Sequence, residues 1–408
     1  MEMEDNNNSQ YFKGLITGMC IGALIVIGTF VGFRLFTDPV STVTPINVSS
    51  EVSKLQDLEA KMEKIYEGID EVYLNDIDIK DMEEAVCKAM LASLGDPYSA
   101  YYTEEEYKSL MEDTSGSYCG IGVSVSHKED DSIVVNAVFE DSPAKKAGIL
   151  PGDKIVKIDD KNVAGNEFDI VVGWVRGEEG TDIELTVLRD GKKYDYKMTR
   201  KEVDVDTVSY EMKQDGIGYI KIASFDGVTK SQFKDAVDNL KEQGMEKVII
   251  DLRDNPGGRM DVVCDIANYF IHKDDLIIYT EGKKGQKESE YATKDGELLG
   301  MPVSVIVNGN SASASELFSG VIKDYKVGKI VGTQTFGKGI AQTLVRISDG
   351  SALKLTYSKY YTPAGINIHE VGITPDEVVE LPDKLISPIL LEEGQEDTQL
   401  QKAIELLK

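Results

Sequence analysis

The chain has 408 residues, of which 41% are hydrophobic, and its 72 acidic and 44 basic side chains give a formal net charge of −28. This length and hydrophobic content predict more than one domain with a buried core. The acidic excess argues against nucleic acid as a partner, because the phosphate backbone is bound by basic surfaces.

Residues 14–33 are predicted to form a transmembrane anchor after a short tail of residues 1–13. No charged side chain lies between Gly14 and Gly32. At about 1.5 Å per residue, this run spans roughly 28 Å, which is enough for the hydrocarbon core of a bilayer. A cleaved signal peptide is the alternative, but no A-x-A cleavage pattern follows the run. We therefore expect an anchor that is not cleaved.

A polar linker that contains proline is predicted over residues 34–50, and helices are predicted over residues 51–115. Apolar residues recur there with helical spacing, which predicts helices that pack on a neighbour; these residues are Leu55, Leu58, Met62, Ile65 and Ile69.

Residues 116–201 are predicted to form a mainly-β domain. Short alternating strands are expected at residues 121–126, 132–138, 154–158 and 182–189. One short helix is expected at residues 142–148. The four cysteines of the chain form no C-x-x-C pair, so neither a zinc site nor a disulfide framework is expected.

Residues 202–408 are predicted to form a mixed α/β core that ends in a helix. The apolar run Val248 to Asp251 precedes Asn255-Pro-Gly-Gly258, which is typical of a buried strand followed by a flexible loop. Further on, strands are expected at residues 303–307, 329–331 and 340–347, and a helix from residue 314 to about residue 323.

Ser313 is a candidate nucleophile at the start of the expected helix. N–H groups at a helix start stabilise an anion such as an acyl-transfer intermediate. The three histidines of the chain, His127, His272 and His369, lie in no nucleophile-elbow or metal-ligand pattern. A serine hydroxyl still needs a base, so a lysine is the expected one.

Lys338 is the candidate base. Its amine accepts a proton only if its pKa lies well below the ordinary value of about 10.4. The chain has no carboxylate from Thr333 to Arg346, which favours a desolvated amine. In extended chain, the even spacing to Gln342 places both side chains on one face, and we expect that amide to hold the amine by a hydrogen bond.

Two other interpretations of these residues are open at this point. Ser313-Ala-Ser-Glu316 is also a capping box, S-x-x-E. Gly332 to Lys338 also matches the P-loop pattern G-x-x-x-x-G-K, which would indicate a nucleotide-binding protein. Against a P-loop, Gly339 stands where a Ser or Thr is required, and a strand is expected to follow in place of a helix.

Together, the two motifs resemble those of the carboxyl-terminal processing peptidases, the S41 family of serine proteases. The family pattern S-A-S-A-S-E followed by T-F-G-K-G-x-x-Q is met at every fixed position, and the spacing of Ser313 and Lys338 also matches. The resemblance implies that Ser313 is the nucleophile, Lys338 the base and Gln342 its support. It also implies a crotonase-like α/β core that needs no metal or other cofactor.

The loop at the end of the apolar run resembles the D-L-R-x-N-P-G-G segment of the same family. This resemblance implies an oxyanion hole formed by the N–H of Ala314 together with that of Gly257 or Gly258. The sequence does not distinguish between the two glycines.

The mainly-β domain resembles the PDZ domain that is inserted in these proteases, through the string S-P-A-x-x-A-G-I-x-P-G-D at residues 142–153. Gly120-Ile121-Gly122 is then expected to hold the terminal carboxylate of a peptide. Ile121 and Val123 are expected to line the pocket for its last side chain.

The hypothesis from the sequence is a single-pass, membrane-anchored serine endopeptidase whose catalytic part lies on the extracytoplasmic side. Its partners are expected to be protein or peptide substrates with apolar C-termini, and the resemblance implies a homodimer. One alternative is a membrane-tethered PDZ scaffold with an inactive peptidase core. The P-loop nucleotide-binding protein is the other.

Overall fold

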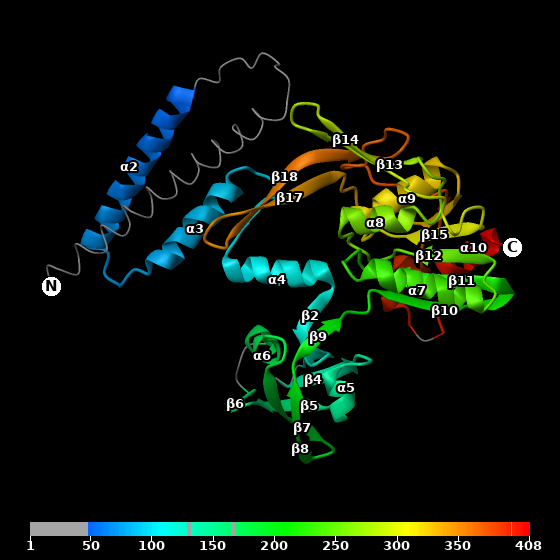
Figure 1. Cartoon of the computed structure of the whole chain (residues 1–408), viewed down its shortest axis with the longest axis horizontal. Helices are drawn as coiled ribbons and strands as arrows, with labels where there is room; N and C mark the ends of the chain where they lie inside the picture. The colour runs from blue at the N-terminus through cyan, green and yellow to red at the C-terminus, as the bar shows by residue number, and fades with distance from the viewer. Residues whose placement is uncertain (1–47, 129–131, 165–167, 393) are drawn as a thin grey trace. The chain divides into compact units, whose positions relative to one another are not determined.

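The computed structural model of the protein describes residues 48–408 apart from 129–131, 165–167 and 393 (Figure 1). The predicted tail, the predicted anchor at residues 14–33 and most of the predicted linker lie outside these residues. In the described part of the chain, no helix combines the length and hydropathy needed to cross a bilayer.

The chain divides into two units, Met1–Leu94 and Gly95–Lys408. The described part of the first unit consists of helices α2 (Val48–Val72) and α3 (Ile79–Ala92). Helix α2 begins inside the range that was predicted as linker. Asp78 caps α3 by accepting hydrogen bonds from two backbone N–H groups of its first turn, which satisfies donors that lack a partner within the helix.

The apolar residues of α2 pack less than the sequence analysis predicted. Met62 packs against the buried ring of Tyr66, and two residues of α3 join them. In contrast, Leu58 and Ile65 are 46% and 53% exposed. Helical spacing therefore predicted the helix correctly, but only part of its apolar face is buried within this unit.

A six-stranded sheet organises the core of the second unit, in the order β10-β11-β12-β15-β16-β19. Its strands are β10 (Val208–Met212), β11 (Ile217–Ile222), β12 (Lys247–Asp251), β15 (Val303–Val307), β16 (Gly328–Gly332) and β19 (Glu377–Val378). Strand β10 pairs antiparallel with β11, and the other neighbours are parallel. Every residue of β15 is buried, as expected for a parallel strand that is covered on both faces.

Helices cover both faces of this sheet (Figure 1). They are α7 (Thr229–Glu242), α8 (Met260–Ala267), α9 (Ala314–Asp324) and α10 (Thr398–Leu406). Alternate strand residues point to opposite faces. Accordingly, Ile249 and Ile306 pack with Ala403 of α10, whereas Ile250 and Val305 belong to the larger cluster that includes α7, α8 and α9.

A second sheet, with the order β1-β18-β13-β14 and with β17 paired to β18, completes the core. Its strands are β1 (Ala100–Tyr102), β13 (Leu276–Gly282), β14 (Lys287–Tyr291), β17 (Ile340–Arg346) and β18 (Ala352–Tyr361). The pairing of β1 with β18 differs from the predicted organisation, which placed residues 51–115 in a helical region and began the core at residue 202. A strand of three residues is too short to show a periodic pattern.

The region of residues 116–201 forms a small β-domain with its own hydrophobic cluster. Its sheet has the order β3-β4-β5-β7-β8, with β6 paired to β5. The elements are β3 (Val123–His127), β4 (Ile133–Val138), α5 (Pro143–Ala147), β5 (Lys154–Ile158), β6 (Lys161–Asn162), α6 (Phe168–Val175), β7 (Asp182–Arg189) and β8 (Lys192–Thr199). The strands expected at residues 154–158 and 182–189 are confirmed to the residue.

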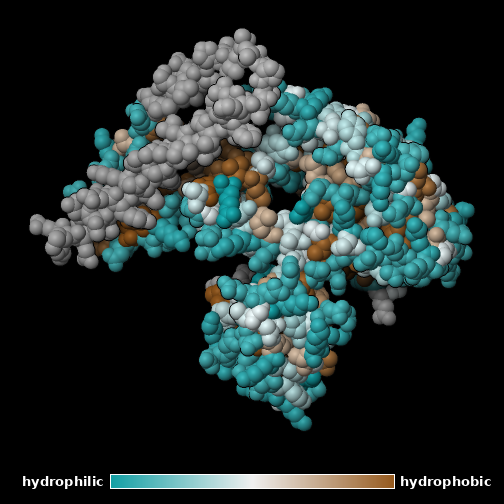
Figure 2. All heavy atoms as spheres, viewed as in Figure 1, coloured by the Kyte–Doolittle hydropathy of each residue, from teal (hydrophilic) through white to brown (hydrophobic). Residues whose placement is uncertain are grey.

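Two paired strands connect this domain to the rest of the chain: β2 (Ser117–Gly120), before the domain, pairs antiparallel with β9 (Lys201–Asp204), after it. Helix α4 (Glu104–Ser115) precedes β2. Short 3-10 turns occur at Gln214–Gly216, Pro382–Lys384 and Pro388–Leu390. The visible faces of the small domain and of the core are mostly hydrophilic (Figure 2), in line with the charge of the chain.

Candidate active site

Ser313 is the residue at which the loop after β15 becomes helix α9, as predicted. Its backbone has φ 53° and ψ −112°, a conformation that costs a residue other than glycine on the order of 1–3 kcal/mol. The N–H of Ser313 donates to Oε2 of Glu316 at 2.8 Å, and the N–H of Glu316 donates to the carbonyl oxygen of Ser313 at 2.9 Å. These reciprocal bonds hold the serine in the strained conformation.

Glu316 connects the serine motif to the lysine motif. This carboxylate is fully buried. Its Oε2 also accepts from the N–H of Lys338 at 2.8 Å, and its Oε1 accepts from Thr335 Oγ1 at 2.6 Å and from the N–H of Gly337 at 2.7 Å. One side chain therefore fixes the backbone of both motifs. The S-x-x-E pattern indicated Glu316 only as part of a capping box, so this role was not predicted.

The side chain of Lys338 is half-buried and points at an aromatic ring. Its Nζ lies 4.7 Å from the centroid of the Tyr98 ring. Within the described residues, no hydrogen bond joins Lys338 to the hydroxyl of Ser313. The structure thus brings the two motifs together through Glu316 but does not show the two side chains bonded to each other.

The surroundings of Lys338 lower the pKa of its amine. Burial lowers the pKa of Lys338 below its ordinary value, and the positive charge of Lys354 acts in the same direction. The carboxylates of Asp96 and Glu316 oppose this shift. The net direction is the one that a general base requires.

Tyr360, on β18, contacts both motifs. Its hydroxyl donates to the carbonyl oxygen of Lys338 and also interacts with the side chain of Ser313. Burial raises the pKa of Tyr360, and the charge of Glu316 adds to the shift.

Gln342 does not make the hydrogen bond that we expected from its spacing. Its Nε2 donates to Thr356 Oγ1 at 3.3 Å and to the carbonyl oxygen of Ile340 at 3.5 Å. The reason lies in the backbone, because the register of β17 against β18 shifts between Ala341 and Gln342. Such a bulge interrupts the alternation of side chains on which the expectation depended.

The two glycines of the loop after β12 differ in what their N–H groups do. The N–H of Gly257 donates to Asn255 Oδ1 at 2.8 Å. The N–H groups of Gly258 and Ala314 have no acceptor in the part of the chain that the structure describes. Gly257 lies against the serine: with its φ of 108°, a Cβ placed there would stand 2.7 Å from Ser313 Cβ and 3.0 Å from the nitrogen of Ala314.

The predicted carboxylate loop of the small domain precedes an open sheet edge. Gly120 ends β2, Val123 begins β3, and β3 is an edge strand. The carbonyl oxygens of Ile121 and Gly122 accept from the N–H groups of Ala144 and Phe139. Their own N–H groups find no acceptor among the described residues.

The side chains of this loop lie in the core of the domain. Ile121 is fully buried in the hydrophobic cluster, and Val123 packs against the same cluster. Gly122 has φ 78°, and a Cβ there would stand 2.2 Å from Ser142 Cβ. A glycine is therefore required at this position. Gly120, Ile121 and Gly122 are all buried in this structure.

Comparisons with known proteins agree with this architecture. The sequence model of peptidase family S41 matches residues 216–379, and that of the PDZ domain matches residues 119–199. A model described as the activating protease CtpB N-terminal domain matches residues 19–106. A relative from Staphylococcus haemolyticus, described as a probable CtpA-like serine protease, is 39% identical over 357 residues, which cover 86% of this chain and 71% of the relative.

The chain belongs to the S41 family of serine peptidases. A second relative of this S41 peptidase, from Staphylococcus aureus and with the same description, is 38% identical over 363 residues, covering 87% of this chain and 72% of the relative. Among solved structures, a photosystem II D1 C-terminal processing protease is 27% identical and has a TM-score of 0.45, over 79% of this chain and 86% of the other.

The fold of the S41 peptidase removes the nucleotide-binding alternative. The segment that matches the P-loop pattern is followed by strand β17, which begins at Ile340. A P-loop needs a helix there, whose N-terminus binds the phosphates. In the described ranges, no group of three or more His, Cys, Asp or Glu side chains could hold a metal ion.

Three residues around the S41 site escaped the sequence analysis: Tyr98, Glu316 and Tyr360. The segments that contain Tyr98 and Tyr360 had no motif with a known chemical role, although both tyrosines lie in aromatic-rich strings. Glu316 had a signal, because it completes the S-x-x-E pattern. The capping interpretation accounts for one bond of its carboxylate but not for the bonds to the lysine segment.

Proposed function

We propose that this S41 peptidase cleaves peptide bonds with Ser313 as nucleophile and Lys338 as general base. The serine oxygen attacks the peptide carbonyl carbon, the amine takes the serine proton and returns it to the leaving nitrogen, and water hydrolyses the acyl-enzyme. The observation that carries this proposal is the bonding of one buried carboxylate, Glu316, to the N–H groups of both residues.

The oxyanion of the tetrahedral intermediate is assigned to the N–H groups of Ala314 and Gly258. Supporting this choice, the N–H of Gly257 is already donated to Asn255. A pair of backbone donors that is fixed before the reaction stabilises the transition state without reorganisation, and each donor contributes roughly 3–4 kcal/mol.

The described arrangement is assigned to a resting form of the enzyme. The amine of Lys338 faces the ring of Tyr98, and among the described residues no hydrogen bond joins it to the hydroxyl of Ser313. Catalysis then requires the amine to leave the tyrosine ring and to accept the serine proton. Both side chains can exchange rotamers while Glu316 holds their backbones.

The test is proteolysis of an unfolded protein with an apolar C-terminus by the full-length chain in detergent, without ATP and with a chelator present. Ser313→Ala and Lys338→Ala should each abolish turnover. Ser289→Ala and Lys329→Ala, which change exposed residues, serve as matched controls and should retain it. Activity that survives both site variants would exclude this pair of residues.

The PDZ domain is proposed to bind the free C-terminus of a substrate along β3, with the carboxylate on the N–H groups of Ile121 and Gly122. An edge strand offers unpaired backbone groups to an added strand. An amidated peptide would leave those donors unpaired, at a cost of about 1–3 kcal/mol. Its binding to the Ser313→Ala variant should therefore be roughly 5- to 150-fold weaker, as measured by fluorescence anisotropy.

The anchor at residues 14–33 is proposed to place the catalytic part on the extracytoplasmic side of the cell membrane. A protease added to spheroplasts, in which the cell membrane is unbroken but exposed, should then degrade residues 48–408. Protection of these residues until the membrane is lysed would contradict the proposed orientation. A homodimer is proposed from the family resemblance and is tested by the mass of the detergent-solubilised protein.

A membrane-tethered PDZ scaffold with an inactive core is the second candidate. One observation favours it: the missing hydrogen bond between Ser313 and Lys338 in the described structure. The two candidates differ in the proteolysis assay, because a scaffold binds the free C-terminus and leaves the peptide intact at every substrate concentration.

A further inference from the structure

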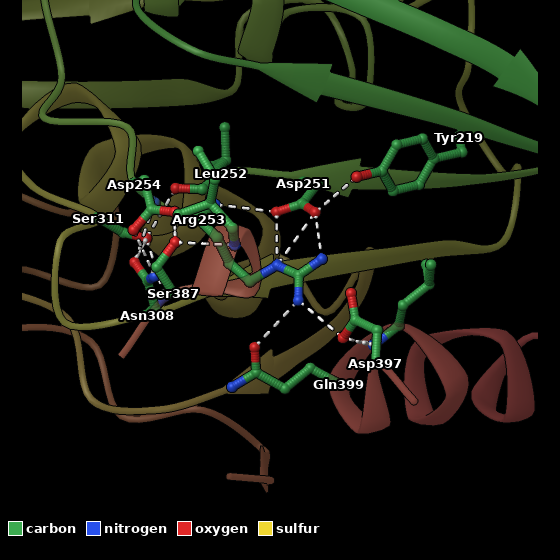
Figure 3. A network of polar contacts seen from close by, with 12 residues as sticks. Tyr219, Asp251, Leu252, Arg253, Asp254, Asn308, Ser311, Ser387, Asp397 and Gln399 are labelled. Atoms are coloured by element: carbon green, nitrogen blue, oxygen red, sulfur yellow. Dashed lines mark hydrogen bonds and ion pairs between the residues drawn. The ribbon is translucent and has the colours of Figure 1, made fainter. Parts of the chain in front are cut away.

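Arg253 lies in the loop that follows β12 and is held from two directions (Figure 3). The side chain is 2% exposed. Its Nε donates to both carboxylate oxygens of Asp251 at 3.0 Å, and one terminal nitrogen donates to Asp251 Oδ2 at 2.5 Å. The other terminal nitrogen donates to Asp397 Oδ1 at 2.8 Å and to Gln399 Oε1 at 3.2 Å. One guanidinium thus joins the central sheet to the start of α10.

Asp254, the next residue, receives a second contact from the C-terminal segment. Its backbone has φ 64°, and its carboxylate accepts a hydrogen bond from the hydroxyl of Ser387. The same carboxylate accepts from Asn308 Nδ2 at 2.9 Å and from Asn310 Nδ2 at 2.8 Å. Asn308 Nδ2 also donates to the carbonyl oxygen of Ile386 at 3.0 Å. Two consecutive loop residues are therefore held by the same distant part of the chain.

The held loop continues directly to the proposed oxyanion hole. Asn255 follows Asp254, and its carbonyl oxygen accepts from the N–H of Ala312 at 3.0 Å and from Ser315 Oγ at 3.0 Å. Its side chain binds the N–H of Gly257. Loop 252–258 thus runs from the two clamped residues to the glycines beside Ser313, and a shift at its beginning is transmitted over a few residues.

The contacts of Arg253 are better suited to fixing the position of the loop than to increasing the stability of the fold. Replacing a buried ion pair by apolar residues is often neutral for stability, whereas a bidentate arginine fixes direction as well as distance. Asp397 already satisfies the helix start by accepting from the N–H of Leu400. A cap needs only this bond, so the contact of Asp397 with Arg253 is additional to it.

We propose that Ser387, Asp397 and Gln399, here called the C-terminal clamp, position loop 252–258 for stabilisation of the oxyanion. They are positioning residues, because they act through Arg253 and Asp254 and do not touch the reacting atoms. The inference depends on the proposed function, which assigns the oxyanion hole to Gly258 and Ala314.

The test compares Asp397→Ser with Ile404→Ala in the full-length chain. Serine retains the helix cap but loses the carboxylate that binds Arg253. Ile404 packs on the same face of the sheet from α10 and makes no polar contact with the loop. A misplaced oxyanion hole should lower kcat about tenfold or more in Asp397→Ser, with KM within twofold of wild type. Ile404→Ala should keep kcat within twofold.

A second readout follows the loop itself, so that the result does not depend on turnover. Hydrogen exchange of the loop amides should become faster in Asp397→Ser, and also in the milder variant Ser387→Ala, but not in Ile404→Ala. Unchanged loop exchange in both clamp variants would overturn the proposal. An equal loss of kcat in Asp397→Ser and Ile404→Ala would overturn it as well.

Failure of the clamp and failure of the proposed function give different results. If Ser313→Ala retains wild-type turnover, the assigned site is wrong, whatever the clamp variants do. If Ser313→Ala is inactive while Asp397→Ser behaves like wild type in both readouts, the site stands and the clamp serves only to hold α10 in place.

Discussion

The amine of Lys338 lies 4.7 Å above the ring of Tyr98, and this contact competes with the contact to Ser313 that the proposed mechanism requires. A cation over an aromatic face is stabilised by about 0.5–2 kcal/mol, depending on how far it is desolvated. The ring therefore favours the charged amine in this position, whereas the proposed mechanism needs the neutral amine at Ser313.

Tyr98→Leu should raise the turnover of the unstimulated enzyme. Losing about 1 kcal/mol from the resting arrangement changes its population relative to the active one by roughly fivefold. Tyr98→Phe keeps the aromatic face and should differ little from wild type. The initial rate at saturating substrate is the measurement, and equal rates for the leucine and phenylalanine variants would show that the ring does not hold the amine.

The rate should rise with pH through the lowered pKa of Lys338, because only the neutral amine accepts the serine proton. Asp96 raises this pKa and Lys354 lowers it. Asp96→Asn should therefore move the acidic limb of the kcat profile to lower pH, and Lys354→Gln should move it to higher pH. Shifts in the same direction for both variants would indicate that another group titrates.

Glu316→Gln should unfold more easily than wild type and should be inactive. The carboxylate accepts hydrogen bonds from Ser313, Thr335, Gly337 and Lys338, and bonds to a buried charged group contribute about 1.5–3 kcal/mol each. The amide offers one acceptor and turns an NH₂ group toward donors. We expect the free energy of unfolding to fall by about 3 kcal/mol or more, measured in urea.

Two further variants serve as controls for the Glu316→Gln experiment. Glu288→Gln changes an exposed glutamate on β14 and should leave both stability and activity unchanged. Thr335→Val removes one donor to Glu316 and should fall between the two. Full activity of Glu316→Gln would mean that the carboxylate does not organise the site.

Asp254 should contribute to the acid sensitivity of the fold. Burial acts to raise the pKa of Asp254, but hydrogen bonds from Ser387, Asn310 and Asn308 hold it below its ordinary value. A carboxyl with a lowered folded pKa contributes stability that is fully present above its unfolded pKa, about 3.9, and is lost as pH falls through the folded value.

The difference in unfolding free energy between wild type and Asp254→Asn should therefore be constant above about pH 5 and should shrink below about pH 4. Urea titrations at several pH values measure this difference. A difference that does not depend on pH would assign the effect of the substitution to packing alone.

The sequence predicted the elements that carry a strong local signal. Strand β15 and the start of α9 were expected at the observed residues. The mostly apolar run of residues 303–307 and the S-x-x-E pattern that begins at Ser313 are local features that can be recognised without knowing any tertiary contact. The serine of the first motif was also placed correctly at the start of α9, and the spacing of the two motifs matched a known family at every fixed position.

The contacts between distant segments were not predictable in the same way. Glu316 binds residues 19 to 22 positions away, and Arg253 meets Asp397 across 144 positions, so no local pattern reports either pairing. The hydrogen bond expected between Gln342 and Lys338 is not made among the described residues, and a β-bulge set by the pairing of β17 with β18 interrupts the alternation of side chains next to Gln342. In each case the information resides in the tertiary structure.

The paired strands β2 and β9 have a consequence for how such an enzyme changes its targets. The strand that leads into the PDZ domain begins at Ser117 and the strand that follows the domain ends at Asp204, and these two residues face each other in the ladder. Because the PDZ domain is inserted between two adjacent positions of the peptidase core, another domain whose termini are equally close can replace it. The path of the core chain then does not change. Target selection can then diverge, in nature or by design, while the hydrolytic machinery is inherited unchanged.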